Sequence, residues 1–234
     1  TLPLPRVEQA IRPSDIHNPP TRLICLENTH NFCQGSPLNP EYMDSVRALA
    51  AKYGLKIHLD GARLFNAAVA QDINVKDLTR QADSVMFCLS KGLSAPVGSL
   101  VCSNRDFIQR ARKFRKMVGG GMRQAGHLAA AGLVALESLV ERLKEDHQNT
   151  QLLAEQLASV EGIELDPAQV KTNIIFFKLK HSKIDGESFL NLLEENSIKI
   201  LMTDPGVFRA VLHREINREQ VETIAKTVRS ILTL

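Results

Sequence analysis

Two short runs of the sequence combine residues that can do chemistry with positions where a fold can use them. Asp60 ends the apolar run 56–60 (KIHLD), and Lys91 ends the apolar run 84–91 (SVMFCLSK). Each run is typical of a buried strand, and a helix-sized insertion separates the two. Open α/β sheets bind ligands at the carboxyl ends of their strands. The pair suits pyridoxal phosphate (PLP), whose chemistry needs a lysine for a Schiff base and an acid partner for the ring nitrogen.

Each of these residues also has a simpler interpretation. An arbitrary lysine at a strand end most often faces solvent, although the Gly and Ser residues that flank Lys91 favour a structured loop. Asp60 could act as a helix N-cap before Gly61, which would stabilise the helix by about 1 kcal/mol. Arg63 follows Asp60 by three residues. It could form a weak i,i+3 surface ion pair or bind a substrate carboxylate, where bidentate geometry favours arginine.

The elements around these runs alternate between strand and helix, as in a mainly parallel sheet with right-handed crossovers. The apolar patterns predict strands at 22–27, 55–59, 83–89 and 98–103. They predict helices at 41–53, 61–70, 75–80 and 106–116, after a proline-rich start with a possible helical turn at 7–11. The first half of the chain is therefore expected to be an α/β domain that holds Asp60 and Lys91 at one edge of its sheet.

The carboxyl-terminal part has a different pattern. We expect a long helix or a pair of helices over 125–160, a strand at 173–179 and a helix at 186–196, then strands near 198–202 and 207–213 and a last helix from Arg218. This order is typical of a compact α+β unit. The predicted domains are a partial PLP-binding large domain at 1–130 and a small domain with a linking helix at 131–234.

Composition excludes several classes of function. The 234 residues are 44% hydrophobic and 24% charged, with a net charge of +3, so nucleic-acid binding has no support. The basic run 110–116 is typical of a solvated helix face. The four cysteines form no CxxC pair, three lie in apolar runs, and no second pair completes a metal site with His30 and Cys33. They suggest a reduced, intracellular protein without a metal, and no signal peptide or bilayer-spanning run is present.

Four separated motifs resemble a known family. They are ENTHN (27–31), HLDGARLFNA (58–67), CLSKGLSAPVGS (88–99) and RKMVGGGMRQAG (115–126). In this order they resemble the low-specificity L-threonine aldolases, which are PLP enzymes of the aspartate-aminotransferase-like fold, or fold type I. The resemblance runs from about Asp15 to the carboxyl terminus. It implies PLP-dependent retro-aldol cleavage of L-threonine or L-allo-threonine to glycine and acetaldehyde.

The resemblance also implies roles for individual residues. Lys91 would hold PLP as a Schiff base, and Asp60 would pair with its pyridine nitrogen. Arg63 and Arg209, the latter in VFRAVLH, would bind the substrate carboxylate. His17 matches a histidine near the substrate hydroxyl. Two further residues, which flank the triple glycine and match basic residues near the cofactor phosphate, are Lys116 and Arg123.

Two departures from the family pattern stand out. Family members usually have R-[LVF]-V-T-H where this chain has Arg209-Ala210-Val211-Leu212-His213, so the arginine and the histidine keep their register. Family members also carry an amino-terminal segment before Thr1, which holds the phosphate-binding loop and a histidine that stacks on the ring. The alternative to an active aldolase is therefore a truncated, non-catalytic form that cannot hold PLP by itself.

Other PLP lyases and transaminases of fold type I are disfavoured, because ENTHN and GGGMRQAG belong to the aldolase pattern. The family implies a homo-oligomer, a dimer of dimers, with a small β-hydroxy-α-amino acid as substrate. Neither nucleic acid nor membrane is expected as a partner. The expected compartment is the cytoplasm, with the mitochondrion as the alternative.

Overall fold

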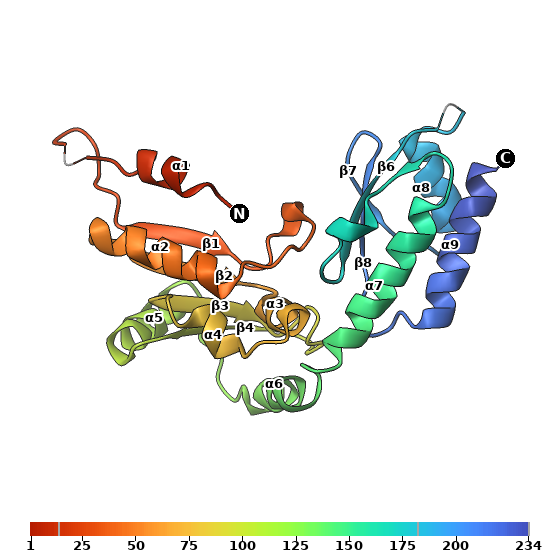
Figure 1. Ribbon diagram of the computed structural model, residues 1–234. Helices are drawn as coiled ribbons and strands as arrows, with labels where there is room; N and C mark the ends of the chain where they lie inside the picture. Colours follow the sequence, from red (N-terminus) through yellow and green to blue (C-terminus); the bar gives the residue numbers. More distant parts are fainter. Residues whose placement is uncertain (14, 182, 234) are drawn as a thin grey trace. The chain divides into compact units, whose positions relative to one another are not determined.

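The computed structural model describes residues 1–13, 15–181 and 183–233 (Figure 1). Its internal contacts divide the chain into two compact units. The amino-terminal unit comprises Thr1–Thr29 and Leu38–Val140, and the carboxyl-terminal unit comprises His30–Pro37 and Glu141–Leu234. The segment His30–Pro37 thus follows the first strand but packs with the second unit. The domains expected at 1–130 and 131–234 stay a prediction.

The amino-terminal unit contains a four-stranded sheet, sheet A, in the order β1-β2-β3-β4. β1, β2 and β3 are parallel and β4 is antiparallel to β3, so the mainly parallel sheet is confirmed. The elements of this unit are α1 (Leu4–Gln9), β1 (Leu23–Glu27), α2 (Pro40–Lys52), β2 (Lys56–Gly61), α3 (Leu64–Gln71), α4 (Val75–Thr79), β3 (Ser84–Cys88), β4 (Ser99–Ser103), α5 (Arg105–Met117) and α6 (Gly126–Ser138).

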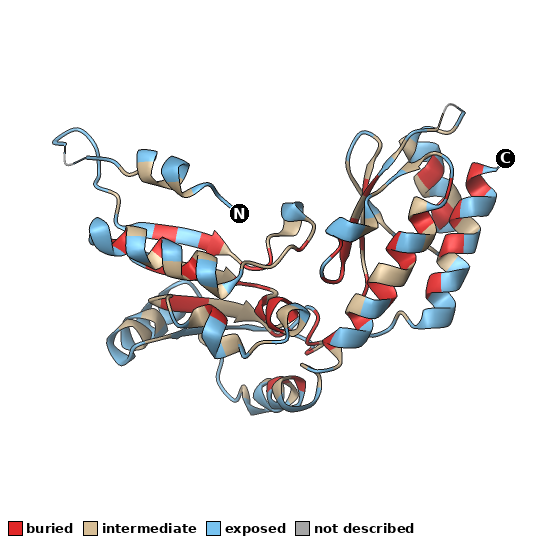
Figure 2. Ribbon diagram, viewed as in Figure 1, coloured by how far each residue is buried: buried red, intermediate tan, exposed pale blue. Residues whose placement is uncertain are grey.

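The two faces of sheet A differ in burial (Figure 2). Ile57 and Leu59 of β2 are fully buried in one core with residues of α2, α3 and α4. The residues that alternate with them point to the other face, because successive side chains of a strand do so. On that face Cys25 is exposed and His58 is half-buried, its Nδ1 lying 2.8 Å from the Ser84 hydroxyl. The face that carries Ile57 and Leu59 is therefore the more deeply buried face of sheet A.

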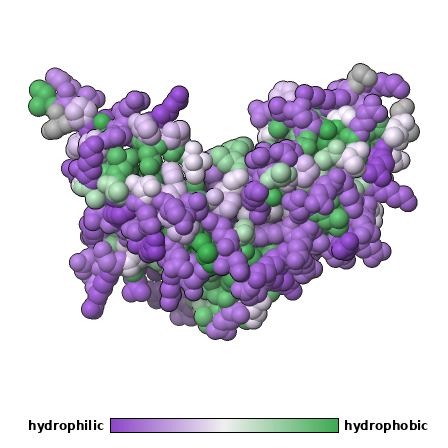
Figure 3. Space-filling model, viewed as in Figure 1, coloured by the Kyte–Doolittle hydropathy of each residue, from purple (hydrophilic) through white to green (hydrophobic). Residues whose placement is uncertain are grey.

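Helix α1 extends this core at its border. Its partly buried Leu4 and Val7 pack against the core that α2 covers, and the Glu8 carboxylate lies 2.6 Å from the Lys52 ammonium of α2. Hydrophobic side chains are visible in this region of the surface in Figure 3. No helix in the described part of the chain combines the length and the apolar character that crossing a membrane needs.

The carboxyl-terminal unit contains an antiparallel sheet, sheet B, in the order β5-β6-β8-β7. Phe177, Phe189 and Phe208 lie at its centre with ring centroids 5.1 to 6.4 Å apart, packed among side chains of α7, α8 and α9. The elements of this unit are the 3-10 helix η1 (Asn31–Cys33), α7 (Leu143–Ala158), β5 (Ile163–Glu164), the 3-10 helix η2 (Pro167–Gln169), β6 (Ile174–Leu179), α8 (Gly186–Glu195), β7 (Leu201–Asp204), β8 (Val207–Val211) and α9 (Arg218–Leu232).

Three features of the sequence can be compared with the structure. The helix expected from Gly61 begins only at Leu64, because β2 runs on to Gly61 and a turn follows. Of the two alternatives for 125–160, a long helix or a pair of helices, the pair is confirmed as α6 and α7, with a break after Ser138. The three cysteines of the apolar runs are not buried: Cys25 and Cys102 are exposed and Cys88 is half-buried. Cys33 is exposed as well. All four are free thiols.

Candidate active site

Asp60 lies at the carboxyl edge of the parallel strands. It pairs with Glu27 of β1 and with Met86 of β3 in the sheet register. Its Oδ1 accepts a hydrogen bond of 3.0 Å from the Ala62 N–H. Among the described residues its Oδ2 accepts none, so one oxygen of this half-buried carboxylate is available to a ligand.

The structure contradicts the N-cap interpretation of Asp60. The N-cap of α3 is Arg63, and no side chain caps that helix. Asp60 instead closes a short turn onto the Ala62 N–H, a common use of Asp before a helix. Since residues 60–63 are not helical, the i,i+3 helical geometry considered for Asp60 and Arg63 does not apply either. Arg63 is half-buried at the start of α3.

Gly61 determines how closely Asp60 approaches the next strand. A Cβ on Gly61 would lie 2.7 Å from the backbone oxygen of Met86 and 2.9 Å from the Cβ of Leu64. No side chain fits there without moving the backbone, so only glycine allows β2 to end in this position. The close packing fixes the peptide that carries Asp60.

Lys91 lies in a tight loop that is anchored at both ends. The Leu89 N–H donates to the Gly98 carbonyl, the Ala95 N–H donates to the Leu89 carbonyl, and the Ser94 N–H donates to the Lys91 carbonyl, at 2.9, 3.0 and 2.9 Å. Leu89, Leu93 and Ala95 are buried, whereas Lys91 is exposed. The loop therefore presents the amine on a fixed backbone. Because β2 and β3 are adjacent and parallel, Asp60 and Lys91 lie at the same edge of sheet A.

The ENTHN motif completes this edge. The Asn28 N–H donates to the Asp60 carbonyl at 2.7 Å, and the Asn28 amide exchanges two hydrogen bonds with the backbone of Leu38. Thr29 is fully buried, and its hydroxyl has no partner in the described part of the chain. A buried hydroxyl without a partner is costly and often marks a site that a ligand completes.

Arg209 lies in the carboxyl-terminal unit, at the middle of β8. It pairs with Phe176 of β6 and Leu201 of β7. Its Nε is buried without a hydrogen-bond partner in the described residues, and burial lowers the pKa of the guanidinium below its usual value. No carboxylate of the described chain forms an ion pair with it. A half-buried, unpaired cation of this kind is suited to an anionic ligand.

The other predicted residues are exposed. The His17 N–H donates to the Asp15 carboxylate at 2.6 Å, in a segment that leads into the amino end of β1. Figure 1 shows this segment away from the carboxyl ends of the strands. Lys116 and Arg123 flank the triple glycine after α5, and neither forms a hydrogen bond or ion pair with Asp60 or Lys91 among the described residues. Their roles stay predictions.

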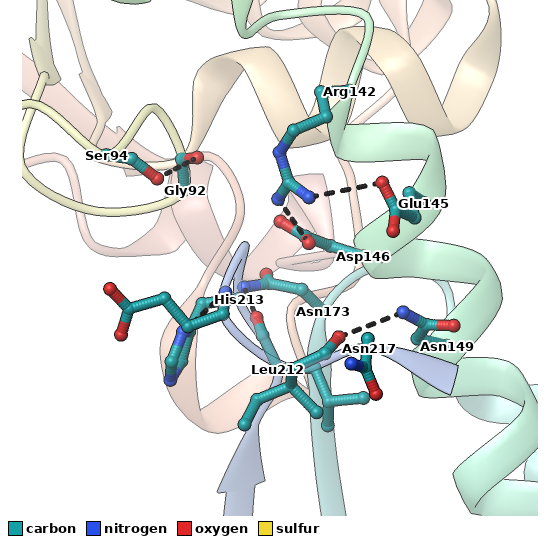
Figure 4. Close-up of polar contacts among 12 residues, drawn as sticks. Gly92, Ser94, Arg142, Glu145, Asp146, Asn149, Asn173, Leu212, His213 and Asn217 are labelled. Carbon is teal, nitrogen blue, oxygen red and sulfur yellow. Dashed lines mark hydrogen bonds and ion pairs between the residues drawn. The ribbon is translucent and has the colours of Figure 1, made fainter. Parts of the chain in front are cut away.

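Sequence reasoning missed a polar cluster in the carboxyl-terminal unit (Figure 4). Arg142 forms an ion pair with the buried Asp146, one helical turn along α7. Burial raises the pKa of Asp146 despite this arginine. The amide of Asn173 donates to the Leu212 carbonyl at 2.9 Å, and that of Asn149 donates to the Ile216 carbonyl at 3.0 Å. These two amide hydrogen bonds hold the turn after β8. The only sequence signal for the cluster was the i,i+4 spacing of Arg142 and Asp146.

A cavity of about 510 Å³ lies beside the turn after β8 in this unit, between α7, α9 and the segment before β7. Its lining is mostly apolar, and none of the predicted site residues contributes to it. In the described part of the chain no three His, Cys, Asp or Glu side chains gather as a metal site would require.

The residues at the edge of sheet A fit a PLP-type cofactor. An available carboxylate oxygen at Asp60, an amine on the fixed Lys91 loop and the unpartnered Thr29 hydroxyl all belong to one sheet edge. A carboxylate for a ring nitrogen and a lysine for covalent attachment are the donor set that this cofactor uses. The structure therefore supports Asp60 and Lys91 as a pair.

Fold and site together define a class, the PLP-dependent enzymes of fold type I. A threonine aldolase from Leishmania major matches 99% of this chain and 67% of its own, with a TM-score of 0.78 and 18% identity. A PLP-dependent aminotransferase from Streptococcus suis matches 99% of this chain and 61% of its own, with a TM-score of 0.75 and 19% identity. At these identities the likeness shows the fold alone.

The chain belongs to the beta-eliminating lyase family, whose model matches residues 1–180. Low-specificity L-threonine aldolase 1 of Arabidopsis thaliana is 43% identical over all of this chain and 66% of its own length. The low specificity L-threonine aldolase of Escherichia coli K12 is also 43% identical, over 99% of this chain and 67% of its own. The chain thus spans about two thirds of the length of these relatives, and the predicted family is confirmed.

Proposed function

We propose that the protein acts in PLP-dependent retro-aldol cleavage of L-threonine or L-allo-threonine to glycine and acetaldehyde. The observation that carries this proposal is the pairing of Asp60 and Lys91 at one edge of a fold type I sheet. The 43% identity to curated threonine aldolases supports the choice of reaction over the other reactions of the fold. We place the cofactor-binding residues in the partial large domain. Arg209, in the small domain, is proposed from the family resemblance to bind the substrate carboxylate.

Lys91 and Asp60 would hold the cofactor. The Lys91 amine stands on a loop whose backbone is fixed by three hydrogen bonds. When a substrate amine takes its place on the cofactor, only the Lys91 side chain would need to move. The available Asp60 oxygen would accept a hydrogen bond from the protonated ring nitrogen and so stabilise its positive charge. When bound, PLP supplies the electron-accepting ring for the electron pair released as the Cα–Cβ bond breaks.

The arginines would orient the substrate. Arg209 carries an unpaired, half-buried guanidinium, so a carboxylate there gains a charge-assisted hydrogen bond and relieves the unpartnered Nε. Arg63, at the start of α3, is the second candidate for this carboxylate. A fixed carboxylate limits how the amino acid can lie, and such positioning is a large part of rate enhancement.

His17 is proposed to take the proton from the substrate hydroxyl. Loss of that proton turns the C–O bond into the carbonyl of acetaldehyde as the Cα–Cβ bond breaks, and Cα then takes up a proton to give glycine. Because His17 is exposed on the segment that leads into β1, this role requires other protein groups to enclose the imidazole together with the substrate. Lys116 and Arg123 are proposed to bind the cofactor phosphate.

We further propose that the protein forms a homo-oligomer and works in the cytoplasm. Exposed apolar side chains on the antiparallel edge strand and on α6 support an assembly. They are Leu100, Val101, Leu133 and Val134.

Borohydride reduction tests the site directly. The protein is incubated with substoichiometric PLP and reduced, and its peptides are mapped by mass. We expect the pyridoxyl adduct on Lys91, lost in Lys91→Ala and kept in the control Lys76→Ala, which removes a lysine from α4. Adducts spread evenly over the lysines would contradict the site. No adduct on folded protein would favour the alternative of a form that cannot hold PLP by itself.

Product analysis tests the reaction. With L-threonine the adduct-forming protein should release acetaldehyde and glycine, and Asp60→Asn should lower the rate by about 100- to 1000-fold, the usual cost of removing a preorganised charge partner. Ammonia and an oxo acid as products would instead indicate another lyase of this fold. A fully active Asp60→Asn variant would contradict the role of the carboxylate.

A further inference from the structure

Arg209 lies in a row of apolar side chains. Phe176 on β6 and Leu201 on β7 are its direct partners across the two neighbouring strands. Side chains of directly paired residues in an antiparallel sheet stand on the same face, about 4.5–5.5 Å apart at Cβ. The guanidinium therefore leaves the sheet between an aromatic ring and a leucine.

This face is opposite to the one that forms the core of the unit. Phe208 and Ala210, the neighbours of Arg209 along β8, are buried with α7, α8 and α9. Arg209 points away from them because successive residues of a strand alternate between faces. The ring of Phe176 is half-buried and that of Phe177 is buried, which follows the same alternation on β6.

A second aromatic ring stands beside Phe176. Phe32 of η1 lies with its ring centroid 6.4 Å from that of Phe176, at an interplanar angle of 50°. Phe32 is 70% exposed and Leu201 is 58% exposed. The three phenylalanine rings in the core of this unit are buried, whereas Phe32 presents most of its ring to solvent. Both Phe32 and Arg209 belong to the carboxyl-terminal unit, which makes this arrangement a property of that unit alone.

The combination has a simple chemical meaning. An unpaired guanidinium with a buried Nε attracts a carboxylate, while the rings and the leucine around it attract an apolar group attached to that carboxylate. A small polar acid satisfies only the first requirement. An acid with an aryl or long alkyl group two or three bonds away satisfies both.

We propose that Phe32 and Phe176 form an apolar wall beside Arg209, and that this wall selects carboxylic acids with an aryl or long alkyl substituent. Resting on the proposed function, the wall makes β-aryl-β-hydroxy-α-amino acids better substrates than threonine, whose substituent is a methyl group. Phe32 is the specificity-determining residue, because it offers the exposed ring.

Ligand binding tests the wall without any cofactor. Binding of 3-phenylpropanoate and propanoate to the whole chain is measured by NMR titration, and the ratio of their affinities is the readout. We expect 3-phenylpropanoate to bind more tightly, and Phe32→Ala to reduce the ratio about three- to tenfold, since an aromatic contact contributes that much in affinity. Arg209→Gln should weaken both ligands. Phe32 is exposed, so its removal leaves the fold in place.

Phe114→Ala is the matched control. Phe114 is 60% exposed but lies on α5 of the other unit, so its removal should leave the ratio unchanged. Phe32→Leu, which keeps apolar surface without the ring, should lose part of the effect. An unchanged ratio in Phe32→Ala, or no preference for 3-phenylpropanoate in the unmodified protein, overturns the proposal.

Substrate competition separates this inference from the proposed function. The ratio of kcat/KM for 3-phenylserine over threonine should fall in Phe32→Ala and stay unchanged in Phe114→Ala. If no acetaldehyde forms but the binding ratio responds to Phe32, the reaction is wrong and the wall stands. If acetaldehyde forms and the binding ratio ignores Phe32, only the wall is wrong.

Discussion

The two units bury their sheets to different extents. Sheet B has a continuous core with three helices, and its central phenylalanines have almost no exposed surface. Sheet A has its own core under α2, α3 and α4, but its strand β4 is largely exposed. The residues with the strongest chemical signal, Asp60 and Lys91, belong to this more open unit.

The difference shows where each unit leaves polar side chains available to a ligand. In the amino-terminal unit the backbone is fixed next to the available side chains of Asp60 and Lys91, by the close packing of Gly61 and by the hydrogen bonds of the Lys91 loop. In the carboxyl-terminal unit a self-contained core supports a single unpaired cation, Arg209, on its other face. Stability and chemistry are therefore separated by sheet face rather than by unit. The predictions below test that separation.

The largest effect is expected in the aromatic core. Phe208→Ala removes a fully buried ring that contacts both Phe177 and Phe189, which should lower the free energy of unfolding of this unit by about 3–5 kcal/mol. Hydrogen exchange resolved by peptide should show the loss over β6, β8 and α9.

Phe32→Ala is the control within the same unit. It removes the same side chain from an exposed position, so the change should stay within about 0.5 kcal/mol. Loss of protection that spreads equally over β1, β2 and β3 in Phe208→Ala would show that the two units unfold as one, and the comparison would fail.

The second prediction concerns acid. Burial lowers the pKa of His147 on α7 to about 4. The unfolded chain binds a proton there near pH 6.5 and the folded unit does not, so stability is fully present above pH 6.5 and is lost as the pH falls to 4. The loss is about 3 kcal/mol at most.

Asp83 in the amino-terminal unit affects stability over a lower pH range than His147. Its burial would raise its pKa, but hydrogen bonds from Arg47, the Ile57 N–H and Lys56 outweigh burial and hold the pKa at about 2. Stability from Asp83 is thus present above about pH 4 and is lost between pH 4 and 2. As the pH falls, the carboxyl-terminal unit should weaken first and the amino-terminal unit later.

Hydrogen exchange at pH 7, 5 and 3 measures both windows. His147→Gln should flatten the pH dependence of the carboxyl-terminal unit between 6.5 and 4, and Asp83→Asn should flatten that of the amino-terminal unit between 4 and 2. Asp146 has the opposite sign, because burial raises its pKa, so the difference between variant and unmodified protein is the quantity to compare. A His147→Gln variant with the original pH dependence would disprove the first window.

The sequence was most informative where a residue's type limits the backbone. Alternating or continuous apolar runs predicted β1, β2, β3 and β6 to within a few residues, and Gly and Pro predicted most of the breaks. Asp60 and Lys91 could be paired because both follow such strands. The start of α3 was misplaced because Gly61 and Ala62 do not exclude a helix, while the packing of Gly61 against Met86 does.

What the sequence could not show depends on neighbours distant along the chain. The buried Asp146 looks like any helical acid, and only its packing reveals that its pKa is raised. The ring of Phe32 follows ENTHN without any motif of its own, and its place beside Phe176 arises from a separation of more than a hundred residues. The apolar runs around Cys25 and Cys102 likewise gave no sign that both thiols are exposed.

The smallest effect concerns helix starts. Asn217 caps α9 through a capping box, in which its side chain accepts from the Gln220 N–H while the Gln220 side chain accepts from the Asn217 N–H, each at 2.9 Å. Asn217→Ala should lower the stability of the carboxyl-terminal unit by about 1 kcal/mol in urea unfolding. Glu222→Ala, one turn further along the exposed face of α9, is the control and should have less effect.

Helix α3 offers the contrast. It begins at Leu64, and its N-cap residue, Arg63, makes no side-chain cap. One oxygen of the nearby Asp60 carboxylate accepts a hydrogen bond from the Ala62 N–H, and the other is available. If Asn217→Ala costs the expected amount, a side-chain cap at α3 would contribute about as much, and α3 lacks that stability at the end of the sheet where Asp60 lies. A negligible cost at α9 would contradict this estimate for α3.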